Sequence, residues 1–134
     1  MTLQKLQNEF LDATEATWHR HSNGGGWVEN TACVDASAYV GPDALVYGHA
    51  RVYGNSRVYG NARVSGHARV YGNSRVYGNA WVYGNSRVYG NAWVFGDAQV
   101  YGYALVYGTG IVFENARVCG TACVYGYALR VNRK

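Results

Sequence analysis

The stretch Val52–Arg63 reads Val-Tyr-Gly-Asn-Ser-Arg-Val-Tyr-Gly-Asn-Ala-Arg, two nearly identical hexapeptides in a row. The same spacing extends far beyond this stretch, because a valine stands at every sixth position from Val28 to Val124. A strict short period over most of a chain predicts a solenoid, in which one small unit stacks on copies of itself.

The residues between the valines predict which side chains face inward. Neighbouring side chains of a strand alternate between two faces, so each valine and the Ala or Ser two residues before it share the inner face. Tyr53 and Arg57 then lie on the outer face. The Gly-Asn pair of each copy turns the chain, and one copy carries Pro42-Asp43 in its place. Because proline holds φ negative, we expect the second turn residue to adopt the positive φ.

Strands this short, with a turn every six residues, are expected to bond to the coils above and below rather than to form hairpins. The pattern resembles the hexapeptide repeat of left-handed parallel β-helices, the family of trimeric acyltransferases and γ-class carbonic anhydrases. The resemblance covers about Val28 to Ala128 and implies an all-β solenoid of triangular coils, three hexapeptides to a coil. The Val-Tyr-Gly-Asn-Ala-Arg copies are most similar to those of bacterial and prophage repeat proteins of poorly known function.

The chain divides into four segments. Apolar residues at three- and four-residue steps predict an amphipathic α-helix from about Thr2 to His19, within residues 1–22. A glycine-rich linker, 23–26, leads into the β-helix, 27–129, with five to six coils, and a basic tail, 130–134, follows. We expect the helix to cover the open first coil; the alternative is that it packs on a neighbouring subunit.

Columns of like residues follow from the period. If a coil takes eighteen residues, positions eighteen apart stack at about 4.8 Å. One outer face then carries a column of tyrosines beside a column of arginines, and the next face begins in the same way. The candidate ligand-binding residues are Arg51, Tyr53, Arg57, Tyr59, Arg69, Tyr71, Arg75, Tyr77, Arg87, Tyr89 and Tyr107.

The charge pattern predicts an anionic ligand for these columns. The chain has a net charge of +4, and between Ala44 and Val100 there are six arginines but one acid, Asp97. Such surfaces bind phosphates, carboxylates or polyanions. Rings about 4.8 Å apart leave no room for a base. A nucleotide is therefore expected in a crevice between subunits, with arginines on its phosphates. The alternative is a merely solvated face, since like charges about 5 Å apart in water repel by only about 0.8 kcal/mol.

A second surface signal is apolar. Contiguous outward apolar residues usually mark an interface, and the resemblance implies a trimer. The alternative is that the C-terminal tail folds back over them. The candidate interface residues are Trp93, Phe95, Ile111, Phe113 and Leu129.

Catalysis has weaker support in the sequence. His49 and His67 are eighteen residues apart and are the candidate bases that the acyltransferase resemblance implies, yet both occupy the Asn position of the turn. The three zinc histidines of the γ-class carbonic anhydrases are not matched, and no metal or cofactor is predicted. Cys33 and Cys123 share a column about five coils apart, too far for a disulfide.

The leading hypothesis is therefore a non-enzymatic binding or inhibitory module that holds a nucleotide or nucleic acid, for example to sequester a signalling nucleotide. The alternatives are an acyltransferase with a histidine base and a structural spacer. Since no apolar run approaches the roughly 20 residues of a membrane span, and no secretory signal precedes the repeat, we expect a cytoplasmic protein without membrane contact.

Overall fold

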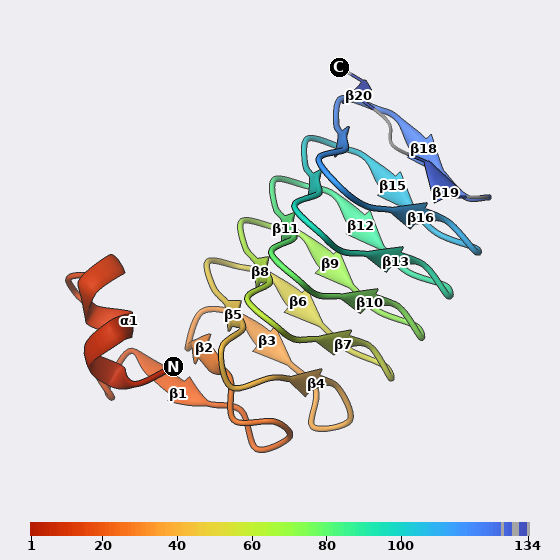
Figure 1. The fold of residues 1–134 in the computed structure, drawn as a ribbon. Helices are drawn as coiled ribbons and strands as arrows, with labels where there is room; N and C mark the ends of the chain where they lie inside the picture. Colours follow the sequence, from red (N-terminus) through yellow and green to blue (C-terminus); the bar gives the residue numbers. More distant parts are fainter. Residues whose placement is uncertain (127, 130–131, 134) are drawn as a thin grey trace.

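The computed structural model of the protein describes residues 1–126, 128–129 and 132–133, with side chains through residue 126. Its backbone winds as a parallel β-solenoid with one short helix beside it (Figure 1). The predicted all-β solenoid is confirmed. The helix in the described part of the chain has neither the length nor the apolar character to cross a bilayer.

Three sheets form the walls of the solenoid, and we name them sheets A, B and C. Sheet A contains β1 (Trp18–Arg20), β2 (Trp27–Glu29), β5 (Leu45–Val46), β8 (Arg63–Val64), β11 (Trp81–Val82), β14 (Gln99–Val100), β17 (Arg117–Val118) and β20 (Asn132–Arg133). Sheet B contains β3 (Cys33–Val34), β6 (Arg51–Val52), β9 (Arg69–Val70), β12 (Arg87–Val88), β15 (Leu105–Val106) and β18 (Cys123–Val124). Sheet C contains β4 (Tyr39–Val40), β7 (Arg57–Val58), β10 (Arg75–Val76), β13 (Trp93–Val94), β16 (Ile111–Val112) and β19 (Ala128–Leu129).

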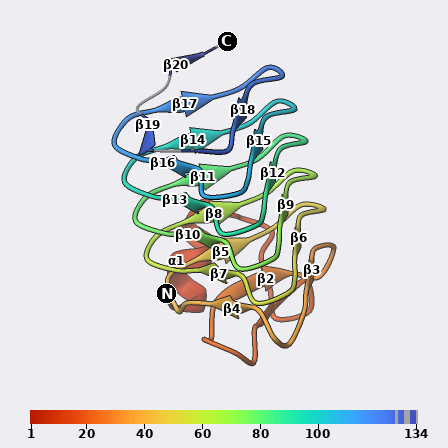
Figure 2. The same ribbon diagram turned by 90° about the vertical axis from the view of Figure 1, so that its right-hand side faces the viewer.

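The eighteen-residue coil is visible in the pairing of the strands. Within each sheet, the repeat strands pair in parallel with the strand of the next coil, as Arg51 with Arg69 and Val52 with Val70 (Figure 2). Hydrogen bonds of about the usual length join the coils, for example from Arg51 N to Ala68 O at 2.9 Å. Sheets B and C have six strands each, in agreement with the predicted five to six coils.

The core consists of small apolar side chains. From Val40 to Val118, the valines of the repeat are fully buried. The alanines two positions before these valines are buried as well. Burying one valine contributes about 1.5 to 3 kcal/mol before the cost of ordering the chain is subtracted. Ser56, Ser74 and Ser86 replace alanine in three coils and are also fully buried. Each hydroxyl donates to the carbonyl three residues earlier at 2.8 to 2.9 Å, so the core tolerates them.

The corners correct one prediction. The positive φ belongs to the glycine of the Gly-Asn pair, with values of 61 to 72° for the corner glycines from Gly48 to Gly120, and not to the residue that follows it. The same position is Pro42 in one early coil, which is not among the positive-φ residues, and Glu114 in a late one, with φ of 55°. Two requirements explain why glycine occupies these corners: the positive φ and the lack of space for a side chain. A Cβ on Gly84 would lie 2.8 Å from the backbone nitrogen of Gly102 in the next coil.

The N-terminal helix is shorter than predicted. Helix α1 spans Leu3–Glu9 and not Thr2 to His19. Beyond it, the hydroxyls of Thr14 and Thr17 bond to local backbone and side-chain groups, which competes with helical bonding. Residues Trp18–Arg20 instead form β1, the antiparallel partner of β2.

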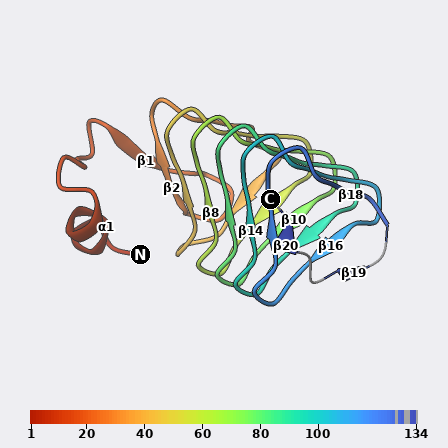
Figure 3. The same ribbon diagram turned by 90° about the horizontal axis from the view of Figure 1, so that it is seen from above.

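The helix also lies in a different place from the one predicted. It packs beside the solenoid on the outer side of sheet A and does not cover the open first coil (Figure 3). Leu6 and Trp18 share a buried cluster with Trp27 and Leu45, which stand in the outward column of that sheet. Glu9 forms an ion pair with Arg63 of the same column, so the contact reaches the third level of the sheet.

The glycine-rich segment predicted as a linker closes part of the first coil. Gly26 N donates to Val40 O at 2.9 Å, and Val40 N donates to Asn23 O at 3.0 Å. The approach is so close that a Cβ on Gly24 would lie 2.2 Å from Val40 O. The glycines therefore cover the free edge of β4, and at Gly24 and Gly26 a side chain would clash with Val40.

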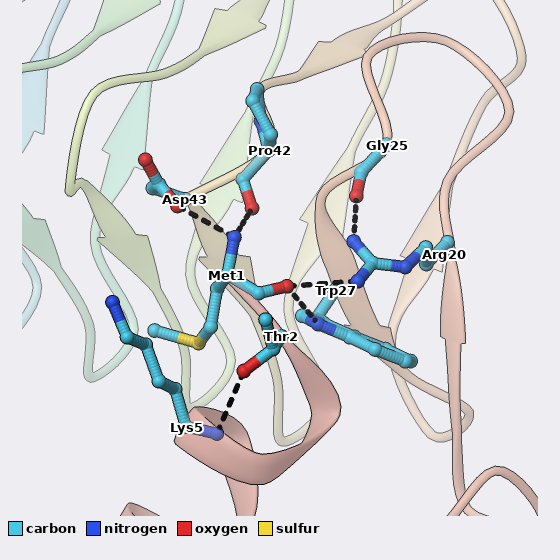
Figure 4. A network of polar contacts seen from close by, with 8 residues as sticks. All are labelled: Met1, Thr2, Lys5, Arg20, Gly25, Trp27, Pro42 and Asp43. Carbon is cyan, nitrogen blue, oxygen red and sulfur yellow. Dashed lines mark hydrogen bonds and ion pairs between the residues drawn. The ribbon is translucent and has the colours of Figure 1, made fainter.

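The first residue of the chain is tied into this region (Figure 4). The Met1 amino group contacts an Asp43 carboxylate oxygen at 2.6 Å and the Pro42 carbonyl at 2.7 Å. The Met1 carbonyl accepts from Arg20 at 2.9 Å and from the Trp27 indole at 3.0 Å. These bonds hold the start of α1 against sheet A and the corner before β5.

The last coil departs from the eighteen-residue period. Leu129 pairs with Val112, seventeen residues away, and not with Ile111 as the period requires. Its register position is thus that of the valine column and not the outward apolar column. This shift arises because the chain is one residue short of the period where it reaches β19. The side chain of Leu129, which the sequence places in the outward apolar group, lies outside the described residues. Of the predicted basic tail, 130–134, the structure describes only the strand Asn132–Arg133.

The two glycine environments make a matched test of the corner geometry. Gly84 and Gly25 have similar positive φ, 69 and 79°, but a Cβ meets backbone at Gly84 and nothing within 4 Å at Gly25. We expect Gly25→Ala to cost about 1 to 2 kcal/mol of unfolding free energy, the conformational penalty alone. Gly84→Ala is expected to cost clearly more, measured by urea unfolding. Equal costs would show that adjacent coils separate readily.

The Met1–Asp43 contact predicts a small acid-dependent change in stability. The hydrogen bond and charge of the Met1 amino group lower the pKa of Asp43. Stability from this pair is therefore present above the unfolded pKa of about 3.9 and is lost as the pH falls through the lower folded pKa. Asp43→Asn should remove this component, worth less than about 1 kcal/mol because solvent screens it. The measurement is urea unfolding between about pH 2 and 6; an unchanged pH profile in the variant would contradict the assignment.

Candidate anion-binding surface

The outer side of sheet B carries the arginine column that the sequence predicts. Arg51, Arg69 and Arg87 follow one another in parallel register on β6, β9 and β12. Arg51 and Arg87 are exposed and Arg69 is partly exposed. Among the described residues, none of the three forms an ion pair with a carboxylate. The column is therefore a row of positive charge without an ion-pair partner in the described part of the chain.

A groove of about 620 Å³ runs beside this column. One side of it is the corner between sheets A and B, and the other side is the arginine column. The lining comes as three pairs from successive coils: His67 with Arg69, Asn85 with Arg87, and Tyr103 with Leu105. Nitrogen donors from four of these six side chains face an open groove, and no carboxylate lines it. Its chemistry suits an anion.

The two candidate catalytic histidines belong to this corner. The rings of His49 and His67 are stacked, with centroids 5.2 Å apart and planes at 12°. Both occupy turn positions and are exposed, and His67 lines the groove. Among the described residues, no group of three His, Cys, Asp or Glu side chains is placed to hold a metal ion. His67 thus lies where it can contribute a hydrogen bond to an anion in the groove, and His49 stacks on it one coil earlier.

The tyrosine column also lies on the outer face of sheet B, next to the corner that leads to sheet C. Tyr53, Tyr71, Tyr89 and Tyr107 stack with centroids 4.7 to 5.1 Å apart and planes within 7° of parallel. This spacing confirms the predicted ladder. Burial raises the pKa of Tyr89, with a further contribution from Tyr71 and Tyr107, so its hydroxyl stays neutral at ordinary pH. Adding a base between two rings would need about 7 Å, twice the 3.4 Å rise of stacked bases.

A smaller hollow lies at the start of the same sheet. It measures about 410 Å³ and is lined by Cys33, Asp35, Arg51 and Tyr53. Asp35 is the carboxylate of this hollow, so the positive row ends here. At the opposite end, Leu105 takes the position above Arg87 and Cys123 the position above Leu105. Arginine thus occupies three consecutive levels of this column.

Sheet C repeats the arrangement in part. Arg57 and Arg75 are in register on β7 and β10, and Tyr59 stacks on Tyr77 at 4.8 Å. Here, however, the arginines have aromatic neighbours. The Arg57 guanidinium lies 5.9 Å from the ring centre of Tyr39, and that of Arg75 lies 5.4 Å from the ring of Trp93. The predicted binding residues therefore fall on two faces and do not form one site.

The predicted apolar group continues the sheet C columns. Phe95 stacks on Tyr77 at 4.9 Å and on Phe113 at 5.6 Å, and Trp93 is 39% exposed. Ile111 follows Trp93 in register and is partly exposed. Four of the five predicted residues are thus neighbours on one face. The side chain of Leu129, the fifth, lies outside the described residues.

Cysteine takes part in a third column, on sheet A. Tyr83 stacks on Tyr101 at 4.9 Å, and a hydrogen bond between Tyr101 and Cys119 raises the pKa of Tyr101. Cys119 is buried, whereas Cys33 and Cys123 are exposed, and none of the three forms a disulfide within the described part of the chain. The two exposed cysteines stand at opposite ends of sheet B, as the period predicts.

Comparison with known proteins agrees with the fold. The chain matches a family model described as YdcK beta solenoid repeat. The matches overlap and span residues 44–60, 56–70, 62–78, 68–84, 74–89 and 86–102. The chain is a repeat β-solenoid protein. These matches cover the arginine column and four of the six groove residues, and they end before Tyr103 and Leu105. No curated protein and no solved structure gave a significant match.

Sequence reasoning missed three groove residues: Asn85, Tyr103 and Leu105. The first two stand at corner positions, which we interpreted only as turn residues. Counting eighteen residues on from His67 leads to Asn85 and then to Tyr103, which is 66% exposed. The period therefore contained the signal for this wall of the groove. What it did not contain was the distance from the corner to the arginine column.

The arginine column predicts an unusual stability response. Arg69 lies between two like charges, so Arg69→Gln should leave the unfolding free energy unchanged or raise it by up to about 1 kcal/mol at low salt. The difference should shrink in about 1 M salt, where charges are screened within about 3 Å. Urea unfolding at two salt concentrations measures it.

Arg63→Gln is the control for this measurement, because Arg63 pairs with Glu9 and lies 5.5 Å from the Trp81 ring. It is expected to lower stability. If Arg69→Gln loses as much stability as Arg63→Gln, the repulsion between arginines is not the dominant effect. The aliphatic part of the Arg69 side chain would then stabilise the fold by packing.

Proposed function

We propose that this protein is a non-enzymatic binding module that holds a phosphate-bearing ligand on the outer side of sheet B. The observation that carries the proposal is the row of Arg51, Arg69 and Arg87, in register, without a carboxylate partner in the described part of the chain, and beside a groove with further nitrogen donors. Guanidinium groups bind phosphate through paired hydrogen bonds.

The energetics favour a bound anion over a bare surface. Neighbouring arginines on a ladder repel, by about 0.8 kcal/mol per pair in water and more where the local dielectric is lower. An anion that contacts two of them converts this repulsion into attraction. The fold itself needs no arginine at these positions, because Leu105 and Cys123 occupy the same column higher in the sheet.

The stacked tyrosines limit how a nucleotide can bind. A base has no access between rings 4.7 to 5.1 Å apart, so contact with this face is through phosphate groups. The proposal extends to an oligomer, with a trimer favoured, in which Trp93, Phe95, Ile111 and Phe113 meet a second copy and a base enters the crevice between subunits. A left-handed winding, as in the hexapeptide-repeat enzymes, and a cytoplasmic location form part of the same proposal. Such a protein would sequester its ligand and not convert it.

The test is a triple variant with a matched control. Arg51→Gln, Arg69→Gln and Arg87→Gln together should reduce affinity for a fluorescent single-stranded oligonucleotide or for a nucleoside triphosphate. Since hydrogen bonds to charged groups contribute about 1.5 to 3 kcal/mol each, the expected loss exceeds about 100-fold. Fluorescence anisotropy at low salt measures it.

Arg57→Gln is the control, because Arg57 has the same place in the repeat but lies on sheet C. Its affinity should stay within a few-fold of the unchanged protein. Mass spectrometry of material released on denaturation identifies any ligand retained through purification. Equal losses in the triple variant and in Arg57→Gln would contradict a site on sheet B. Turnover of an acyl donor that disappears in His49→Asn with His67→Asn would contradict a non-enzymatic role.

A further inference from the structure

We infer that the ligand of the sheet B surface is a linear chain of phosphate groups that lies parallel to the solenoid axis. This inference rests on the proposed function and names the ligand class for the same site. The chemistry is that of successive phosphodiesters or phosphoanhydrides, as in a single-stranded nucleic acid or an inorganic polyphosphate.

The direction of the groove is the first argument. Its lining consists of one corner residue and one strand residue from each of three successive coils. A groove lined in this way crosses the coils, and therefore follows the axis along which they stack. Both of its walls repeat with the period of the coil, and nitrogen donors occur in two successive coils, from His67 with Arg69 and from Asn85 with Arg87.

The length of the arginine row is the second argument. Arg51, Arg69 and Arg87 are on consecutive strands, so with about 4.8 Å per strand the row extends over about 10 Å. Two neighbouring guanidinium groups can share one phosphate through hydrogen bonds of about 2.9 Å, but the outer two stand too far apart for that. In this register, the row is filled only by an anion with charges at more than one place along a line.

The ends of the row set its extent. Toward the N-terminus, Arg51 lines not the groove but a hollow that it shares with Cys33 and Asp35, and the Asp35 carboxylate repels phosphate. Toward the C-terminus, Leu105 takes the position of the next arginine and also lines the groove. The positive track is thus three coils long, and it accommodates a short run of phosphates before the charge ends.

The tyrosine column shows what the surface does not recognise. Its rings cover each other's faces, with planes within 7° of parallel from Tyr53 to Tyr107. Within the described residues, sheet B thus lacks a slot between rings in which a base could be read. Contacts that repeat identically from coil to coil suit a backbone of repeating phosphates, which carries no base sequence.

Multivalent contact gives the inference a measurable consequence. Once one phosphate is bound, the next phosphate of the same chain binds intramolecularly, without a new loss of translational freedom. Affinity should therefore rise with the number of linked phosphates until the row is filled. For a single strand, the slope of log affinity against log salt is about −0.7 per phosphate contacted, so three contacts predict about −2.

The experiment compares anions of increasing length on the full chain. The probes are inorganic phosphate, pyrophosphate, triphosphate and longer polyphosphates, together with a thymidine monophosphate and oligothymidylates of increasing length. Isothermal titration calorimetry at low salt gives the affinities, and repeats at several salt concentrations give the slopes. The variants are Arg69→Gln in the middle of the row, Arg87→Gln at its end, and Arg57→Gln on sheet C as the control.

The inference is supported if affinity per chain rises at least about 10-fold from one phosphate to the length that fills the row and then levels off. Arg69→Gln should then lower the affinity for the longer chains more than 10-fold, Arg87→Gln should shorten the length at which affinity levels off, and Arg57→Gln should leave both unchanged. Response to polyphosphate alone, or to oligothymidylate alone, also supports it and identifies the source of the phosphate chain.

Two results overturn the inference in distinguishable ways. If single phosphates or mononucleotides bind as tightly as the chains, with loss in Arg69→Gln, the linear ligand is wrong and the binding function of sheet B stands. If none of the probes binds at low salt, or if binding is the same in the three variants and the unchanged protein, both the linear ligand and the proposed function fail.

Discussion

The parallel hydrogen-bonded ladder between coils is the constraint on which the rest of the structure depends. It sets the separation of equivalent residues at the distance between neighbouring strands and repeats this separation through every wall. The valine core, the corner glycines and the aromatic stacks all follow from it. The main neighbours of a residue on this molecule are the equivalent residues one coil before and one coil after. Its contribution to stability therefore depends on whether identical side chains attract or repel each other at this distance.

Different residue types respond differently to that repetition. Tyrosine benefits, since parallel rings at about 5 Å contribute dispersion and exclude water. Asparagine also benefits at the corners, where the Asn61 amide donates to Asn79 and the Asn79 amide donates to Asp97. Arginine does not, because like charges meet. On sheet C aromatic rings relieve that cost, and on sheet B none of the three arginines forms an ion pair with a described carboxylate. The difference between the two faces directs attention to sheet B as the functional one.

Most of the solenoid was predictable because the period translates directly into register. The columns of Arg51, Tyr53 and Trp93 needed only the number eighteen.

The prediction failed where forces outside the period decide the structure. The hydroxyls of Thr14 and Thr17 and the pairing of β1 with β2 end the helix early, and no repeat predicts them. The register of Leu129 shifts by one because the chain is one residue short of the period where it reaches β19. The corner φ was misassigned because Pro42 was taken as a guide to the glycine corners. The groove was missed because its two walls come from different positions of the repeat.

The eighteen-residue coil has a consequence for how such a protein can change over evolutionary time. Duplication or loss of one coil leaves every remaining contact between neighbouring strands intact, since each coil bonds only to the next. The outer columns would then lengthen or shorten in single steps of about 4.8 Å. A binding surface on this scaffold can therefore be adjusted to the length of its ligand by gene-level addition of whole units, whereas in a globular domain the same change would require a new core.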